Sequence, residues 1–274
     1  MLKLMYITND AMIAKAAESA GVDRVFIDLE TLNKKERQFG RNTFITTHVA
    51  EDVKLIRSVI DKSELLVRVN PVNINSKDEI DKVVSYGADI IMLPMFKTAN
   101  EVKDFISIVD GRCRTMLLIE HKDAVENLDD ILKVKGIDEF HIGLNDLHIS
   151  MGKKFMFELI ADGTVDKIMK KVKEKGYPIG FGGVSRLGTG LLPADIILAE
   201  HYRLGSNGVI LSRGFTEGMD FDNEKCVRKH FYDNIFAIRE KEKSFNIHDE
   251  SFFSLMHNKL VESVKSIINR EERS

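Results

Sequence analysis

The chain has 274 residues, of which 43% are hydrophobic, and its 40 basic and 43 acidic side chains give a formal charge of −3. This balance excludes the strongly basic composition typical of proteins that bind nucleic acids or anionic membranes. The length fits one large domain, and single α/β barrels often reach this size. We therefore expect small metabolites as ligands.

The cysteine content and the N-terminal sequence favour a cytoplasmic protein. Cys113 lies in an apolar run, so two buried free thiols in a reducing compartment, Cys113 and Cys226, are favoured over a disulfide. Residues 1–8 are followed at once by Asn9 and Asp10, and they lack the apolar run and cleavage site of a signal peptide. No stretch of the sequence is long and apolar enough to span a bilayer.

A short phrase of the type Gly-x-Asp or Gly-x-Asn followed by apolar residues recurs along the chain. Each copy follows a helical pattern, and its Gly suits the left-handed conformation that ends many helices. Strands are predicted at these four copies, residues 21–28, 87–94, 136–143 and 205–212, and also at residues 2–7, 65–69, 113–119 and 178–181. Helical patterns alternate with them at residues 10–20, 51–61, 77–86, 99–109, 123–133, 164–175, 193–203 and 223–241.

Strict alternation of strands and helices predicts a parallel sheet, and a count of eight favours a closed (β/α)8 TIM barrel over an open doubly wound sheet. We assign residues 1–241 to a barrel catalytic domain and residues 242–274 to a C-terminal helical extension. In the extension, apolar residues recur at helical spacing, so an extra helix packs either on its own barrel or on a neighbouring subunit: Phe252, Met256, Leu260, Val264 and Ile267 or Ile268.

Two predicted helices begin with a capping box. In this motif a hydroxyl side chain accepts a hydrogen bond from the backbone three residues on, and a Glu at that position accepts one in return. The pairs are Ser76 with Glu79 and Thr98 with Glu101.

Two carboxylates end neighbouring predicted strands, Glu120 after residues 115–119 and Asp146 after residues 139–145. In a barrel both would lie at the carboxyl ends of the strands, where barrel enzymes place their active sites. A hard cation such as Mg²⁺ or Mn²⁺ is typically held by one or two carboxylates and keeps its other positions for water and substrate. The alternative for Glu120 is a salt bridge, or a cap on the helix that begins near Asp123.

Arg68 ends the predicted strand at residues 65–69, and its guanidinium could bind a substrate carboxylate or a developing enolate oxygen. The alternative is that it neutralises Asp28 or Glu30. The Gly-rich run at residues 180–190 follows the seventh strand, a region where barrels often bind phosphate, although a tight turn explains the glycines about as well. His141 alternates with apolar residues and is interpreted as part of the core.

The chain resembles the HpcH/HpaI aldolase and citrate lyase β-subunit family of the phosphoenolpyruvate/pyruvate barrel superfamily. The resemblance runs from about residue 21 to residue 215. It rests on motifs that occur in the same order: Ile-Asp28-Leu-Glu30, Val-Arg68-Val-Asn70, residues 87–95, Leu-Ile-Glu120 with residues 124–128, and Ile142-Gly-Leu-Asn-Asp146-Leu with Ser150-Met-Gly152.

The resemblance implies that Glu120 and Asp146 ligate Mg²⁺ or Mn²⁺ and that a 2-oxo acid completes the metal's shell. It places Arg68 at the carbonyl oxygen that becomes the enolate, and charge stabilisation there is what retro-aldol cleavage requires. Catalytic candidates are Arg68, Glu30 and His48. Candidates for substrate binding are Arg68, Asn70, Asp28, Asn145, Gly143 and Pro94.

Three features depart from the aldolase pattern. Thr31 stands where the aldolases have a His for proton transfer, so His48, Glu30, His121 or a water on the metal must act as the base. Only about nineteen positions separate residues 94 and 113, where the aldolases have a long excursion. The segment at residues 31–50 carries basic residues that suit either solvent or an anionic substrate: Lys34, Lys35, Arg37 and Arg41.

The leading hypothesis is therefore a divalent-metal lyase that makes or breaks a carbon–carbon bond next to a 2-oxo acid such as pyruvate, with an aldehyde as the other product. The alternatives are a citrate-lyase-like enzyme acting on an acyl-CoA thioester, and a non-catalytic binding barrel. The resemblance also implies a homo-oligomer, a trimer or a hexamer.

Overall fold

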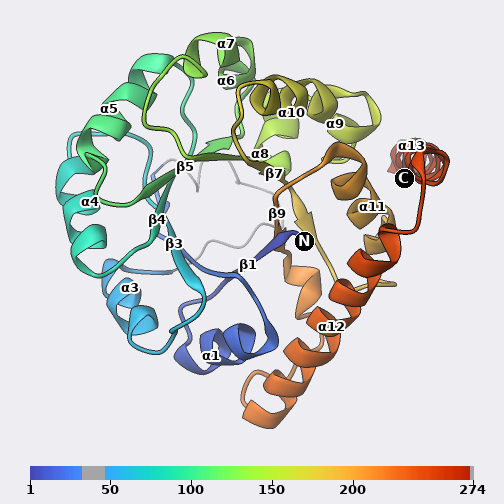
Figure 1. The fold of residues 1–274 in the computed structure, drawn as a ribbon, viewed down its shortest axis with the longest axis horizontal. Helices are drawn as coiled ribbons and strands as arrows, with labels where there is room; N and C mark the ends of the chain where they lie inside the picture. The colour runs from blue at the N-terminus through green and yellow to red at the C-terminus, as the bar shows by residue number, and fades with distance from the viewer. Residues whose placement is uncertain (33–46, 272–274) are drawn as a thin grey trace.

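A computed structural model of the chain describes residues 1–32 and 47–271. Its strands are all parallel and form the ring seen in Figure 1, surrounded by helices, which confirms the predicted (β/α)8 TIM barrel with an extra C-terminal helix. The strands are β1 (Lys3–Ile7), β2 (Arg24–Asp28), β3 (Glu64–Arg68), β4 (Ile90–Leu93), β5 (Arg114–Ile119), β6 (Glu139–Ile142), β7 (Ile179–Phe181), β8 (Gly183–Val184) and β9 (Gly208–Leu211).

Strands β7 and β8 together form the seventh strand of the barrel, interrupted at Gly182. β7 pairs with β6, whereas β8 pairs with β9, which in turn pairs with β1. Gly182 has a φ of 53°, and a Cβ there would lie 2.6 Å from Leu144 Cδ1. Its N–H donates to the Ile142 carbonyl at 2.8 Å. The interruption lets one strand bond to both neighbours and closes the ring.

The helices of the described residues cover the outside of the barrel. They are α1 (Ala11–Ala20), α3 (Ala50–Arg57), α4 (Ser76–Ser85), α5 (Ala99–Val109), α6 (Lys122–Glu126), α7 (Leu128–Ile131), α8 (Leu144–Ser150), α9 (Glu158–Ala161), α10 (Thr164–Glu174), α11 (Ala194–Leu204), α12 (Glu224–Phe245) and α13 (Glu250–Glu271). The helix predicted at residues 123–133 is two short helices that meet at Asn127. The residues between β6 and α10 that the sequence leaves without a predicted helix, 147–162, contain most of α8 and all of α9.

The last two helices lie outside the ring, beside α11 (Figure 1). Helix α12 continues to Phe245, past residue 241, and α13 packs on α11 and α9 of the same chain. Met256, Leu260 and Val264 are buried there, as their helical spacing predicts. The division into a catalytic domain and an extension stays a prediction.

One of the two predicted capping boxes is confirmed. Thr98 and Glu101 exchange both hydrogen bonds at the start of α5. The Ser76 box is wrong, because α4 begins after Asn75 and the Glu79 carboxylate instead accepts from the Asn70 side chain at 2.8 Å.

Two other sequence expectations concern thiols and membranes. Both cysteines are free, but only Cys113 is partly buried and Cys226 is exposed, so the prediction of two buried thiols is wrong. None of the helices in residues 1–32 and 47–271 is both long and apolar enough to cross a membrane.

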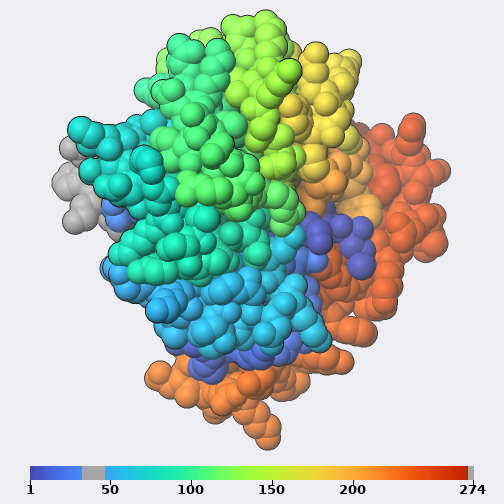
Figure 2. Space-filling model, turned by 60° about the vertical axis from the view of Figure 1, so that its left-hand side comes forward, coloured from blue at the N-terminus to red at the C-terminus, as the bar shows by residue number. Residues whose placement is uncertain are grey.

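Apolar side chains form two separate layers. One cluster fills the barrel interior with side chains such as Met5, Phe26 and Met116, and a larger one lies between the strands and the helices. In Figure 2, α3 to α5 (blue to green) form a continuous outer surface, while the C-terminal helices (orange to red) lie along the lower and right-hand edges.

The amino end of the barrel is closed by a buried ion pair. Arg24 at the start of β2 reaches across to Glu139 at the start of β6, with Nη1 2.8 Å from Oε2, and its Nε donates to Glu64 at 2.8 Å. The side chains of Arg24 and Glu139 are only 5% and 12% exposed. Because β2 and β6 lie on opposite sides of the ring, the pair ties its two halves together.

We expect Arg24→Met to lower the free energy of unfolding by about 3–5 kcal/mol, because it leaves the Glu139 carboxylate buried without its partner. Urea denaturation measures this change. The control is Lys77→Met, which breaks the exposed pair with Asp81 and should cost less than about 1 kcal/mol. A similar small cost for both variants would contradict the proposed role of Arg24.

Candidate active site

The carboxyl ends of β2 and β3 bring a cation and its partner together. Asp28 and Arg68 are directly opposite each other in the strand register. Arg68 Nε and Nη2 donate to the two Asp28 carboxylate oxygens, each at 2.8 Å. Glu30 Oε2 lies 3.5 Å from Nη2. This bidentate contact fixes the plane of the guanidinium. The predicted neutralisation of Arg68 by acidic neighbours is observed.

The third nitrogen of Arg68 is directed to Glu120. Nη1 lies 4.0 Å from Glu120 Oε2, too far for a hydrogen bond, and no hydrogen bond of Nη1 is found among the described residues. Burial lowers the pKa of the guanidinium, but Asp28, Glu30 and Glu120 more than reverse this and raise it. Arg68 is therefore a permanent cation with one nitrogen available to a ligand.

Glu120, at the end of β5, is held on one side only. Its Oε1 accepts from the Met95 backbone N–H at 3.0 Å, while Oε2 accepts no hydrogen bond from the described residues. Gly143 lies against it, and a Cβ there would come within 2.9 Å of Glu120 Oε2. Met95 takes a left-handed φ of 53°, which aims its N–H at the carboxylate.

Burial raises the pKa of Glu120 well above its usual range. Arg68 and the Met95 amide oppose the shift, whereas the charges of Glu30 and Asp146 add to it. Asp146 lies in the first turn of α8, directly after β6, and β6 pairs with β5, so the two acids predicted from the sequence follow neighbouring strands. A buried carboxylate among other acids is stabilised in its charged form by a cation.

The remaining predicted substrate residues occupy the same end of the barrel. Pro94 follows β4, and Gly143 and Asn145 lie at the start of α8. Asn70 is already engaged, because its Oδ1 accepts from the Thr31 and Leu32 backbones at 2.9 and 3.0 Å and its amide donates to Glu79. In this arrangement Asn70 positions the segment after β2.

His48 and His121 lie near this end of the barrel. His48 Nδ1 accepts from the Asp28 N–H at 3.1 Å. A neutral imidazole that accepts at Nδ1 carries its proton on Nε2. His121 Nδ1 accepts from the Asp123 N–H at 3.2 Å and caps α6, and burial lowers its pKa. His141 is buried within β6 and bonds to the Gly182 carbonyl, so its interpretation as a core residue is confirmed.

The donor set fits a hard divalent cation. Glu120 has a carboxylate oxygen without a hydrogen bond, and Asp146 is close enough to interact with it. Across residues 1–32 and 47–271, no group of three or more His, Cys, Asp and Glu side chains converges on a metal position. Two carboxylates with water and an oxygen-rich substrate are a common arrangement for Mg²⁺.

Sequence reasoning missed the Met95 backbone amide, because no sequence signal predicts a left-handed φ at a Met. It named Gly143 only as a substrate residue, whereas the structure gives it a packing role against Glu120. The basic residues Lys34, Lys35, Arg37 and Arg41 lie outside the described residues.

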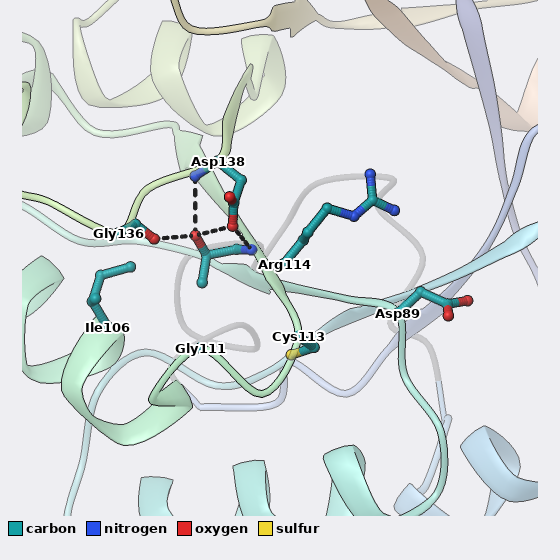
Figure 3. A pocket seen from close by; sticks show the side chains of 8 residues that line it. Asp89, Ile106, Gly111, Cys113, Arg114, Gly136 and Asp138 are labelled. Atoms are coloured by element: carbon teal, nitrogen blue, oxygen red, sulfur yellow. Dashed lines mark hydrogen bonds between the residues drawn. The ribbon is translucent and has the colours of Figure 1, made fainter.

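A surface hollow of about 460 Å³ lies at the opposite end of the barrel (Figure 3). Asp89, Cys113, Arg114 and Asp138 line it, all from the segments that lead into strands. The Asp138 carboxylate accepts from the Thr115 N–H at 2.7 Å, so it connects the amino ends of β5 and β6. This hollow is separate from the candidate site.

A sequence model of the HpcH/HpaI aldolase/citrate lyase family matches residues 4–158. A 2-keto-3-deoxy-L-rhamnonate aldolase of Shigella dysenteriae is 26% identical over an alignment that covers 43% of this chain and 55% of the relative. One from Escherichia coli is 29% identical, covering 31% of this chain and 42% of the relative. The alignments thus span about half the length of these curated relatives.

Solved structures show the same fold. An HpcH/HpaI aldolase from Desulfitobacterium hafniense has a TM-score of 0.61 at 17% identity, covering 77% of this chain and 86% of its own. An aldolase/citrate lyase family protein from Burkholderia cenocepacia has a TM-score of 0.61 at 14% identity, covering 89% and 93%.

The raised pKa of Glu120 has a consequence for stability. The unfolded chain ionises this carboxyl near its ordinary pKa of about 4.3, whereas the folded, metal-free protein accepts the charge only at higher pH. The contribution of Glu120 to stability is therefore largest at acidic pH and is lost as the pH rises through the raised pKa. We expect metal-free Glu120→Gln to melt at least about 3 °C above the wild type at pH 8 and to lose this advantage near pH 4.5.

Differential scanning fluorimetry across this pH range makes the measurement. Glu51→Gln is the control, because Lys82 holds the pKa of the exposed Glu51 carboxyl below its usual value. That variant should not gain stability at pH 8. A Glu120→Gln variant that melts at or below the melting temperature of the wild type at pH 8 would contradict a raised pKa of Glu120.

Proposed function

The chain belongs to the HpcH/HpaI aldolase/citrate lyase family, and we propose that it is a divalent-metal-dependent carbon–carbon lyase acting next to a 2-oxo acid. In the cleavage direction a 4-hydroxy-2-oxo acid would give pyruvate and an aldehyde. The observation that carries the proposal is the position of Arg68 Nη1, 4.0 Å from the buried Glu120 carboxylate and without a hydrogen bond among the described residues.

Glu120 and Asp146 would hold Mg²⁺ or Mn²⁺. When bound there, the ion would supply a Lewis acid for the carbonyl oxygen of the oxo acid. Arg68 would donate from Nη1 to the same oxygen as it gains negative charge. Asp28 would keep the guanidinium fixed during this change, so the donor needs no reorganisation when the charge develops.

Glu30 and His48 are the proposed proton-transfer groups. The Glu30 side chain is buried beside Arg68, and a carboxylate in this position would accept the proton of the substrate hydroxyl. His48, with its proton on Nε2 when neutral, would serve as a donor. Gly143, Asn145 and Pro94 would form the walls that position the oxo acid.

The aldehyde is proposed to derive from a sugar acid, as the names of the curated rhamnonate aldolase relatives suggest. A cytoplasmic location and a trimeric or hexameric assembly stay predictions. Cleavage of a 4-hydroxy-2-oxo acid would exclude the non-catalytic barrel, and saturable binding of an acyl-CoA in its place would favour the thioester alternative.

Metal removal tests the first part of the proposal. We expect EDTA to abolish turnover, and Asp146→Ala to abolish the oxalate-dependent binding of Mn²⁺ measured by isothermal titration, because one of two protein ligands is lost. Asp129→Ala is the control, since Asp129 is an exposed partner of Lys171 and its loss should leave the metal affinity unchanged. Full turnover in EDTA, with unchanged metal binding by Asp146→Ala, would refute metal dependence at this site.

The guanidinium geometry is tested by Arg68→Lys, which keeps the charge but loses the fixed pair of hydrogen bonds to Asp28. We expect kcat to fall by about 10²–10³, the typical effect of removing one preorganised donor, with a smaller change in KM. Steady-state kinetics of aldol cleavage give both values. Arg57→Lys, in the pair with Asp89 at the other end of the barrel, should keep kcat within about twofold. A kcat above a tenth of wild type for Arg68→Lys would argue against its role.

A further inference from the structure

The segments after β8 and β9 meet at the same end of the barrel as Arg68 and Glu120. Val184 pairs with Leu211, and the Ser212 N–H donates to the Val184 carbonyl at 2.8 Å, so the strand ends are in fixed register. The segments touch beyond the strands, since a Cβ on Gly214 would lie 3.1 Å from Ser185 Cβ. Ser185 therefore lies beside the residues that follow β9, and Arg186 comes directly after it in the chain.

The turn at residues 185–190 is held by its own hydrogen bonds. The Thr189 N–H and hydroxyl both donate to the Arg186 carbonyl, at 3.2 and 2.8 Å. The Ser185 hydroxyl donates to the Thr189 carbonyl at 3.2 Å. The backbone at Arg186 is thus positioned without any contribution from the Arg186 side chain.

The Arg186 guanidinium has no partner in the part of the chain that the structure describes. The residue is half-buried, and its Nε is buried without a hydrogen bond. The other buried or half-buried arginines of the described residues are each paired with carboxylates: Arg24, Arg57, Arg68, Arg203 and Arg239. A buried donor left without an acceptor destabilises the folded protein. An arginine in this state is ready to bind an acceptor from a ligand.

A second polar group lies near the start of this turn. Ser212 precedes the short helix η1 (Arg213–Phe215) but makes no capping hydrogen bond to it. Its hydroxyl oxygen lies 3.7 Å from the position of a Cβ on Gly214, the same Gly that touches Ser185. Segments after the seventh and eighth strands of barrels often bind anionic groups.

We propose that Arg186, assisted by Ser212, binds the anionic terminal group of the aldehyde half of the substrate, a phosphate ester or a carboxylate. The proposal rests on the proposed lyase function and gives it a substrate class. Arg68 and the acidic cluster bind the oxo-acid half, and Arg186 fixes the far end of the aldehyde through charge-assisted hydrogen bonds. Its contribution is to specificity, because it does not contact the reacting atoms.

The test compares three aldehydes in the condensation direction with pyruvate: neutral glyceraldehyde, glyceraldehyde 3-phosphate and succinic semialdehyde. We expect Arg186→Gln to raise the KM for the phosphate or the carboxylate aldehyde at least tenfold, with kcat/KM for glyceraldehyde within twofold. The aldehyde affected identifies the anion. Arg186→Lys should recover part of the loss, and Ser212→Ala should give a smaller increase of the same KM.

The matched control is Lys135→Gln, which removes the same charge from an exposed residue at the opposite end of the barrel and should change none of the three KM values. An equal effect of Arg186→Gln on all three aldehydes, or no effect on any, would overturn the proposal.

A binding experiment tests the proposed anion site independently of the proposed lyase function. Isothermal titration with glycerol 3-phosphate and with succinate, neither of which can react, should show binding of one of them to the wild type and its loss in Arg186→Gln. If the wild type turns over no aldehyde but this result holds, the lyase function fails and the anion site stands. The anion site is refuted if neither glycerol 3-phosphate nor succinate binds the wild type. It is also refuted if the wild type and Arg186→Gln bind them equally.

Discussion

The ion pair between Asp28 and Arg68 is the constraint on which the candidate site depends. It joins two residues that face each other at the ends of neighbouring parallel strands, so the barrel register itself determines the distance between them. With both Asp28 oxygens engaged, the guanidinium can rotate very little, and its third nitrogen faces Glu120. A donor aligned before the reaction is worth more than a flexible one, because no reorganisation is needed when charge develops.

At the same end of the barrel, buried acidic groups destabilise the metal-free folded protein. Burial raises the pKa of Glu120, and the charges of Glu30 and Asp146 add to this shift while Arg68 opposes it. Such an arrangement costs stability in the metal-free protein, and enzymes often accept this cost where function needs unusual charges. The other end of the barrel is arranged differently, since Arg24 there is satisfied by Glu64 and Glu139 and holds the ring together. The amino ends of the strands thus hold the ring together, while their carboxyl ends carry the proposed site.

The sequence predicted the barrel, and it placed charged residues at the carboxyl ends of the strands, because both depend on short-range patterns. Alternating apolar runs and glycine-ended helices specify the strands, and charged residues at strand ends mark the carboxyl rim, as for Arg68 and Glu120. The remaining features depend on contacts between distant segments. Glu79 forms no capping box because Asn70 binds it. The Met95 N–H reaches Glu120 only because Met95 takes a left-handed backbone conformation, which its residue type does not predict. Among the described residues Arg186 has no hydrogen-bond partner at Nε, which depends on the folded surroundings and could not be predicted from the Gly-rich run alone.

We propose that Arg68, Glu120 and Asp146 form one enolate-stabilising centre. Crystals grown with Mn²⁺ and oxalate, with data collected at a wavelength where manganese scatters anomalously, test it most directly. We expect an anomalous peak bonded to the Glu120 and Asp146 carboxylates, with an oxalate oxygen within hydrogen-bond distance of Arg68 Nη1. A peak bound elsewhere, or oxalate bound away from Arg68, would show that these carboxylates serve the fold and not the chemistry.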